Sequence, residues 1–87
     1  MKRDSINATY IEQAVEETNA ALCKQLIQKG DGAFISTHEA LGIIAEEYDE
    51  LKDAVRSNNI EDVKKELLDI IVAAQFTVVC INQGVIR

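Results

Sequence analysis

Residues 67–81, LLDIIVAAQFTVVCI, are apolar on nearly every side when the segment is drawn as a helix. In a water-soluble protein, such a helix lies between other helices or in a contact between subunits. Its longest run of consecutive apolar residues, Ile70 to Ala74, is far too short to cross a bilayer. The rest of the chain, or a second copy of it, must therefore cover this segment.

The composition favours helices for that covering role. The 87 residues include no proline, 4 glycines and few aromatics, and 47% of them are hydrophobic. Ala, Leu, Ile and Glu are strong helix formers, so the sequence predicts an all-α fold with a single domain, residues 1–87. A domain this small buries a limited core alone, and we expect a dimer or tetramer that completes a helical bundle through its first and third helices.

The ends of the first two helices are marked in the sequence. Apolar residues recur at helical spacing over about residues 7–29, and Gly30 ends that helix. Ser36 lies three residues before Glu39, which is the spacing of a capping box. A second helix is therefore predicted to begin at Ser36 and to end near Arg56.

A short polar turn, residues 57–59, follows the second helix. Asn59 can cap a third helix over about residues 60–82, which Gly84 ends. Because the turn is short, the second and third helices are predicted to form an antiparallel hairpin, with the first helix preceding it.

Two acids lie beside the apolar face of the second helix. Steps of three and four residues define that face, which we interpret as core: Leu41, Ile44, Tyr48, Leu51 and Val55. Glu47 and Glu50 each precede one of these residues by one position and therefore lie on an adjacent stripe. The acids on the outward side, Glu46, Asp49 and Asp53, are interpreted as a solvated face.

The third helix repeats this arrangement. Glu66 and Asp69 are also three residues apart, and they lie beside Leu67 and Ile70. An antiparallel hairpin places the two acid pairs at similar heights above the turn. We therefore expect the four carboxylates to meet across the hairpin.

Four facing carboxylates repel one another strongly in a partly dry site. Asp69 is the most telling of them, because it interrupts an apolar run, and a buried carboxylate needs a proton, a basic partner or a metal. A hard divalent cation bound by carboxylate oxygens would compensate the charges of all four acids, and Mg²⁺ or Mn²⁺ suits such donors. The predicted metal ligands are Glu47, Glu50, Glu66 and Asp69.

Two segments carry a family resemblance. EEYDEL, residues 46–51, and EDVKKELLDIIV, residues 61–72, resemble the MazG-like all-α nucleoside triphosphate pyrophosphohydrolases, whose signature is Glu-x-x-Glu, a spacer, and Glu-x-x-Asp on a helical hairpin. The resemblance covers residues 36–81. It implies Mg²⁺ binding, a homodimer or homotetramer, and house-cleaning hydrolysis of a nucleoside triphosphate to a nucleoside monophosphate and pyrophosphate.

That activity assigns roles to the acids. Metal ions would clamp the phosphates and lower the pKa of an attacking water, and a carboxylate that the metal does not saturate would accept the proton of the water. Glu47 and Glu50 are the two candidate catalytic bases, and the sequence does not choose between them. Members of the family continue past the third helix with a further basic segment, whereas this chain ends at Arg87. The alternative hypothesis is therefore a catalytically degenerate, acidic helical module that binds a protein partner.

The net charge, the N-terminal segment, the cysteines and His38 give further expectations about partners, location and burial. A net charge of −6 argues against nucleic-acid and anionic-membrane binding. The N-terminal segment has no apolar signal sequence, so a cytoplasmic location is expected, with Cys23 and Cys80 as free thiols in the core. His38 is predicted to be a surface residue of the first helical turn that points away from the acids.

Overall fold

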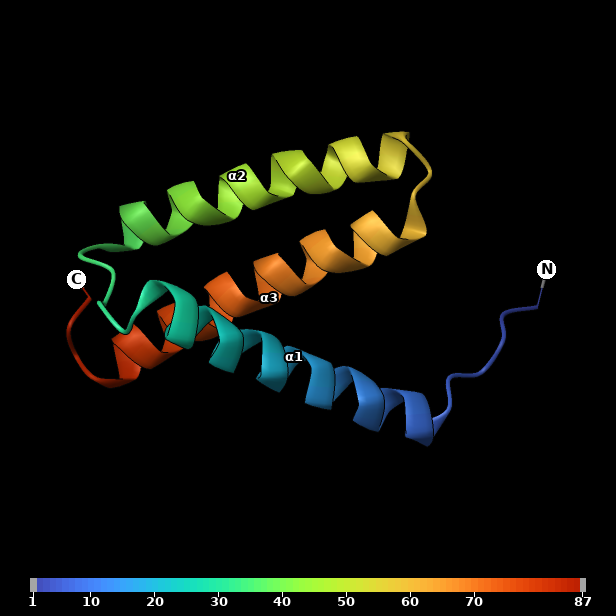
Figure 1. The fold of residues 1–87 in the computed structure, drawn as a ribbon, viewed down its shortest axis with the longest axis horizontal. Coiled ribbons are helices and arrows are strands. Elements are labelled where there is room, and N and C mark those ends of the chain that lie inside the picture. The colour runs from blue at the N-terminus through green and yellow to red at the C-terminus, as the bar shows by residue number, and fades with distance from the viewer. Residues whose placement is uncertain (1, 87) are drawn as a thin grey trace.

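Three α-helices make up the chain in a computed structural model that describes residues 2–86. They are α1 (Ala8–Lys29), α2 (Thr37–Arg56) and α3 (Ile60–Asn82), and the described range contains no strand. The prediction of an all-α fold is confirmed. Helices α2 and α3 form the expected antiparallel hairpin, and α1 packs on another side of α3, running in the same general direction as α3 (Figure 1). Arg87, the last residue of the sequence, lies outside the described residues.

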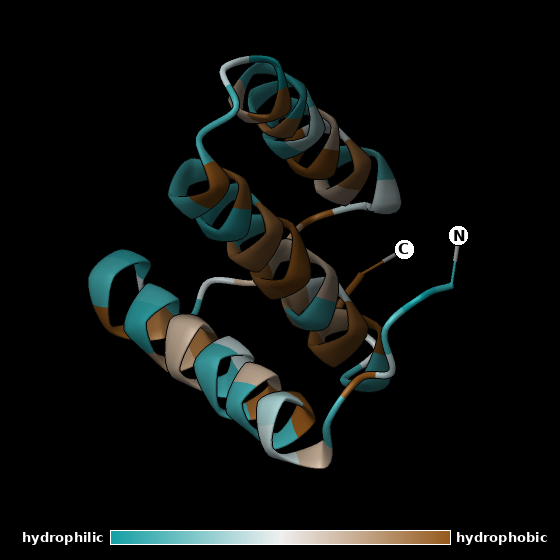
Figure 2. Cartoon of the chain, turned by 90° about the vertical axis from the view of Figure 1, so that its right-hand side faces the viewer, coloured by the Kyte–Doolittle hydropathy of each residue, from teal (hydrophilic) through white to brown (hydrophobic). Residues whose placement is uncertain are grey.

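The central position of α3 follows from its apolar sequence. Both α1 and α2 pack on α3, and within residues 2–86 they do not pack on each other. Figure 2 shows α3 between the other two helices, with hydrophobic residues along most of its length. The helix that is apolar on most sides therefore has neighbours on two of them, as expected.

The helix starts are the ones that the capping residues predict. Ser36 Oγ accepts a hydrogen bond from the Glu39 backbone N–H at 3.1 Å. The carboxylate of Glu39 reaches back to the backbone N–H of Ile35 at 3.2 Å, one residue before the usual partner in a capping box. Asn59 Oδ1 accepts from the backbone N–H groups of Glu61 and Asp62 at 3.1 and 3.2 Å.

The end of α3 is a Schellman turn. Gly84 has a φ of 72°, a conformation that glycine adopts without steric cost. The backbone N–H of Val85 bonds to the carbonyl of Cys80 at 3.1 Å, and that of Gly84 bonds to the carbonyl of Ile81 at 3.0 Å. The chain thereby reverses and returns to the side of α3.

This reversal closes a small core at one end of the molecule. Ala40, Cys80 and Ile86 are buried there, and Phe34 and Phe76 pack against them. The two phenyl rings meet edge to face, with their centroids 4.9 Å apart. The cluster joins the α1–α2 connection, the start of α2 and the end of α3, so it fixes the open end of the hairpin opposite the turn.

The apolar face of α2 differs from the prediction. Leu41, Tyr48 and Val55 are 63%, 55% and 55% exposed, whereas Ala40 and Ala54 are 3% and 7% exposed. The interpretation of the large apolar residues as core was wrong for these three, although Ile44 and Leu51 are partly buried. Among the helices of residues 2–86, α2 packs only on α3, and it does so with the stripe that carries small residues and the acids.

Cys80 is buried, as predicted, but Cys23 is exposed, so its assignment to the core was wrong. Of the two other helices in the described range, α1 contacts only α3, and none of the residues of α1 is fully buried. Both cysteines are free thiols. No helix among residues 2–86 has the length and apolarity needed to cross a membrane.

Candidate metal centre

The hairpin brings the four predicted acids together. Glu47 and Glu50 come from α2, and Glu66 and Asp69 come from α3. One carboxylate oxygen of each lies within 4.8 Å of one from every other member. The prediction that the two pairs meet across the hairpin is confirmed. We call these four residues the acidic cluster.

The turn between the helices sets this register. Asn58 adopts a positive φ of 56°, which asparagine tolerates better than most residues, and Asn59, the N-cap of α3, follows immediately. Ala54 on α2 and Ala73 on α3 are both buried. Small residues let two helix backbones approach, and this brings carboxylates on facing helices within reach of the same point.

Burial leaves part of the acidic cluster without partners. Glu47, Glu66 and Asp69 are partly buried and Glu50 is exposed, and the side chain of Glu66 is only 12% exposed. Glu47 Oε2 and Glu66 Oε2 are buried oxygens with no hydrogen-bond partner among the described residues. A buried acceptor without a partner destabilises the fold, and more so when it carries charge.

The pKa of Glu47 also shows that negative charge is unfavourable in the acidic cluster. The pKa of Glu47 is raised above its ordinary value, first by burial and then by the negative charges of the other three acids, Asp69 foremost. Both causes disfavour the ionised form. The site therefore favours any species that brings positive charge to Glu47.

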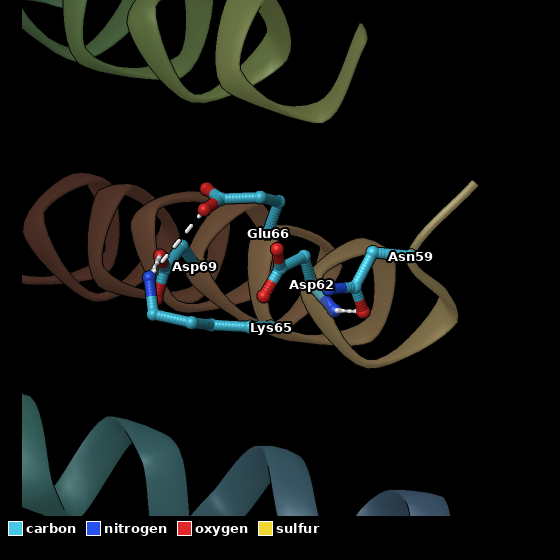
Figure 3. Close-up of polar contacts among 5 residues, drawn as sticks. All are labelled: Asn59, Asp62, Lys65, Glu66 and Asp69. Carbon is cyan, nitrogen blue, oxygen red and sulfur yellow. Dashed lines mark hydrogen bonds and ion pairs between the residues drawn. The ribbon is translucent and has the colours of Figure 1, made fainter. Parts of the chain in front are cut away.

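One cation of the chain already lies beside the acidic cluster. Lys65 Nζ is 3.4 Å from Glu66 Oε1 and 3.6 Å from Asp69 Oδ2. Figure 3 shows its side chain folded along α3 toward the two carboxylates. These charges, with Asp69 first, raise the pKa of Lys65. One ammonium compensates at most one of four carboxylates, and it leaves the buried oxygens of Glu47 and Glu66 without partners.

The residues present fit a hard divalent cation. All four side chains offer oxygen, two come from each helix, and two buried oxygens have unused acceptor capacity. Carboxylate donors of this kind suit Mg²⁺ and Mn²⁺ better than softer metals. No histidine or cysteine belongs to the acidic cluster, and His38 is exposed in the first turn of α2, as predicted.

A cavity of about 330 Å³, which we call the α1–α2 cavity, adjoins the acidic cluster. Glu47 and Asp69 line one part of its wall, and Phe34 and Phe76 line another. Gln25 and other residues at the end of α1 complete the wall. No local feature of the sequence predicts this cavity, because its walls come from three helices and the connection between α1 and α2, and no local pattern encodes their relative positions.

Lys65 is a second residue near the site that was not singled out from the sequence. The available signal was its spacing of four residues before Asp69, which places oppositely charged side chains on one helix face. Glu46, Asp49 and Asp53 are exposed, as predicted for a solvated face. Two of them nevertheless lie near the site: Glu46 lines the α1–α2 cavity, and Asp53 lines an open depression beside Glu50. Asp49 pairs with Lys52 at 3.2 Å and Asp53 with Arg56 at 3.8 Å.

The chain matches no protein-family model, no curated protein and no solved structure.

Proposed function

We propose that this chain is a Mg²⁺-dependent nucleoside triphosphate pyrophosphohydrolase of the house-cleaning type, able to use Mn²⁺ in place of Mg²⁺. The observation that carries the proposal is the acidic cluster with its two buried, unpartnered oxygens, Glu47 Oε2 and Glu66 Oε2. The resemblance of its two segments to the MazG-like signature gives the reaction class. The products would be a nucleoside monophosphate and pyrophosphate, formed in the cytoplasm.

The acidic cluster would hold the metal through Glu47, Glu50, Glu66 and Asp69. When bound, the metal supplies positive charge for the phosphates and lowers the pKa of a coordinated water. The four side chains hold the site in place, because each pair lies within a single turn of a helix that is fixed by packing. Phosphates can contact the four carboxylates themselves only together with cations, so metal dependence of the reaction follows from the charges of the acidic cluster.

The two candidate bases lie on different sides of the acidic cluster. Glu47 lines the α1–α2 cavity, whereas Glu50 lines a separate and more open depression near the hairpin turn. A water beside a ligand in the cavity would be closer to Glu47. We therefore assign proton acceptance to Glu47 and keep Glu50, the exposed member, as the second candidate.

The α1–α2 cavity is a suitable place for the nucleoside. Its volume of about 330 Å³ is that of a small-ligand pocket. Phe34 and Phe76 offer aromatic surface to a base, and Gln25 offers an amide that can donate and accept hydrogen bonds. Glu47 and Asp69 lie on the same wall, so a nucleoside there would carry its phosphates toward the acidic cluster.

The exposed apolar stripe of α2 supports self-association. Leu41, Tyr48 and Val55 are seven residues apart, so they line one side of α2 across two-turn intervals. We propose that a second copy of the chain covers this stripe in a homodimer or homotetramer. The same stripe favours the alternative function, in which a different protein binds there and the acidic cluster does not turn over nucleotide.

The test is pyrophosphate release from a panel of nucleoside triphosphates with and without Mg²⁺. Asp69→Asn and Glu66→Gln should each lower kcat/KM by about a hundredfold or more, because each removes charge that holds the metal. Asp49→Asn removes an exposed acid that lines neither the cavity nor the depression beside Glu50, and it should leave the rate unchanged. Turnover that survives both cluster substitutions would refute the proposal. No turnover of any nucleotide, with a stable complex with another protein, would favour the alternative.

A further inference from the structure

The cations of this acidic chain are unevenly distributed. The sequence has 9 Lys and Arg residues and a net charge of −6. A groove of about 510 Å³ between α1 and α3, which we call the α1–α3 groove, is lined by four lysines: Lys24, Lys29, Lys64 and Lys65. Two come from the second half of α1 and two from the first half of α3. Two acids, Glu61 and Asp69, also line the groove, so its wall carries four cations against two anions. This local excess of positive charge on a negatively charged molecule favours the approach of anions.

Two of these lysines are already paired. Lys64 forms an ion pair with Glu17 across the two helices, and Lys65 lies beside Glu66 and Asp69. Lys24 and Lys29 form no ion pair with any described residue. Their ammonium groups are therefore the ones available to a ligand, and the Lys64–Glu17 pair helps to fix the walls between which they lie.

The α1–α3 groove adjoins the α1–α2 cavity. Both are lined by Gln25, Lys29 and Asp69. Asp69 is also a member of the acidic cluster. A ligand that begins in the cavity and passes the acidic cluster at Asp69 therefore enters the groove, where it meets the free lysines.

We propose that Lys24 and Lys29 in the α1–α3 groove bind the terminal two phosphates of a nucleoside triphosphate, the part that leaves as pyrophosphate. This inference rests on the proposed function for the identity of the ligand. In that reaction a water oxygen bonds to the α-phosphorus and loses a proton to Glu47, and the bond from this phosphorus to the oxygen bridging to the β-phosphorus breaks. The bridging oxygen departs with the electron pair as part of pyrophosphate. Ammonium groups stabilise this growing charge as point charges that need no fixed angle.

The first experiment titrates inorganic pyrophosphate into the metal-free protein in EDTA at low ionic strength, with calorimetry as the readout. The wild type should bind pyrophosphate in a saturable way. The double variant Lys24→Gln/Lys29→Gln should bind roughly tenfold more weakly, since two exposed charges are lost. Lys52→Gln is the matched control, because Lys52 is a lysine on α2 that does not line the groove, and it should bind like the wild type.

Equal affinity in all three proteins, or no binding by the wild type, would overturn the groove assignment. Circular dichroism of the double variant checks that the fold is kept, as expected for exposed side chains. A separate titration with Mn²⁺ tests the acidic cluster: the double variant should bind the metal like the wild type. A wild type that binds pyrophosphate but no metal would keep the groove and refute the hydrolase, so the two failures are distinguishable.

The second experiment places the groove on the reaction path. With metal present, the affinity for a nonhydrolysable nucleoside triphosphate analogue is compared with that for the matching monophosphate. The double variant should lose affinity for the analogue by roughly tenfold and keep its affinity for the monophosphate, which lacks the terminal phosphates. Equal losses for both ligands would contradict the assignment of the lysines to those phosphates.

Discussion

Glu47 is a single side chain through which a bound cation would change the stability of the fold. Its stripe on α2 packs on α3, so part of the carboxylate is buried next to three other acids. A glutamine of the same shape would remove the charge while keeping the volume. The cost of the acidic cluster in the absence of a cation is therefore measurable at this one position.

Glu47→Gln should change how stability depends on pH. The folded-state pKa of Glu47 is raised above 4.5, so the folded protein binds more protons than the unfolded protein in the pH range above that value. Stability of the metal-free wild type therefore falls as pH rises through this range. In urea unfolding with EDTA, Glu47→Gln should be more stable than the wild type at about pH 8, and the difference should vanish toward about pH 4.5. A difference that does not depend on pH would contradict this origin.

Lys65→Met should strengthen metal binding. Lys65 lies beside Glu66 and Asp69, so a metal ion competes with its ammonium for these carboxylates. Removing that charge should lower the Kd for Mg²⁺ by about threefold to tenfold in calorimetry at low salt. Lys64→Met, whose partner Glu17 lies outside the acidic cluster, should change the Kd much less. Weaker binding in Lys65→Met would show that the lysine supports the metal site rather than competing for it.

At the scale of the helices, the cap of α3 connects stability to the register of the acidic cluster. Asn59 Oδ1 accepts two backbone hydrogen bonds at the start of α3, directly after the hairpin turn. The cap thus fixes where α3 begins relative to α2. Glu66 follows two helical turns later, so the position at which α3 begins determines where Glu66 lies relative to the acids of α2.

Asn59→Ala should lower the free energy of unfolding by about 1 kcal/mol, the typical value of an N-cap. The matched comparison is Asn7→Ala at the start of α1, where the side chain accepts one bond from the Thr9 backbone N–H at 2.8 Å. The residues around Asn7 are exposed, so the loss there should be smaller and metal affinity should be unchanged. Urea unfolding and Mg²⁺ titration of both variants check this, and equal effects on metal affinity would contradict the role of the α3 cap.

At the scale of the whole molecule, the main feature is how much apolar surface one copy leaves uncovered. The chain extends over 46 × 29 × 25 Å, and its fully buried hydrophobic residues are few and mostly small. Large apolar side chains remain exposed on all three helices, including Val15, Tyr48 and Leu67 at 54%, 55% and 43%. Surface of this kind marks an interaction face.

Tyr48→Glu should therefore convert a homo-oligomer to a smaller species. Tyr48 lies at the middle of the exposed stripe of α2, and a charge there would have to be buried by a second copy. Light scattering coupled to size-exclusion chromatography should show the change, while circular dichroism stays helical because the side chain is exposed within one copy. Asp53→Lys, far round the same helix, is the control for a change of charge. A wild type that is already a monomer would refute self-association through this stripe.

The sequence by itself determined the elements and the meeting of the acids. Helix ends depend on nearby residues such as Ser36, Asn59 and Gly84, and each makes the local contact that was predicted. A three-residue turn between two helices leaves little choice of direction. The spacing of three between Glu47 and Glu50, and between Glu66 and Asp69, then places the carboxylates on facing stripes.

Only the tertiary structure decided which side of each helix is covered. Hydrophobic periodicity identified an apolar stripe on α2, but the packed stripe lies one step round, where Ala40 and Ala54 allow close approach to α3. The position of α1 in turn determines the exposure of Cys23, the α1–α2 cavity and the α1–α3 groove. These features depend on distances between segments far apart in the chain, and a local pattern of residue types carries no information about such distances.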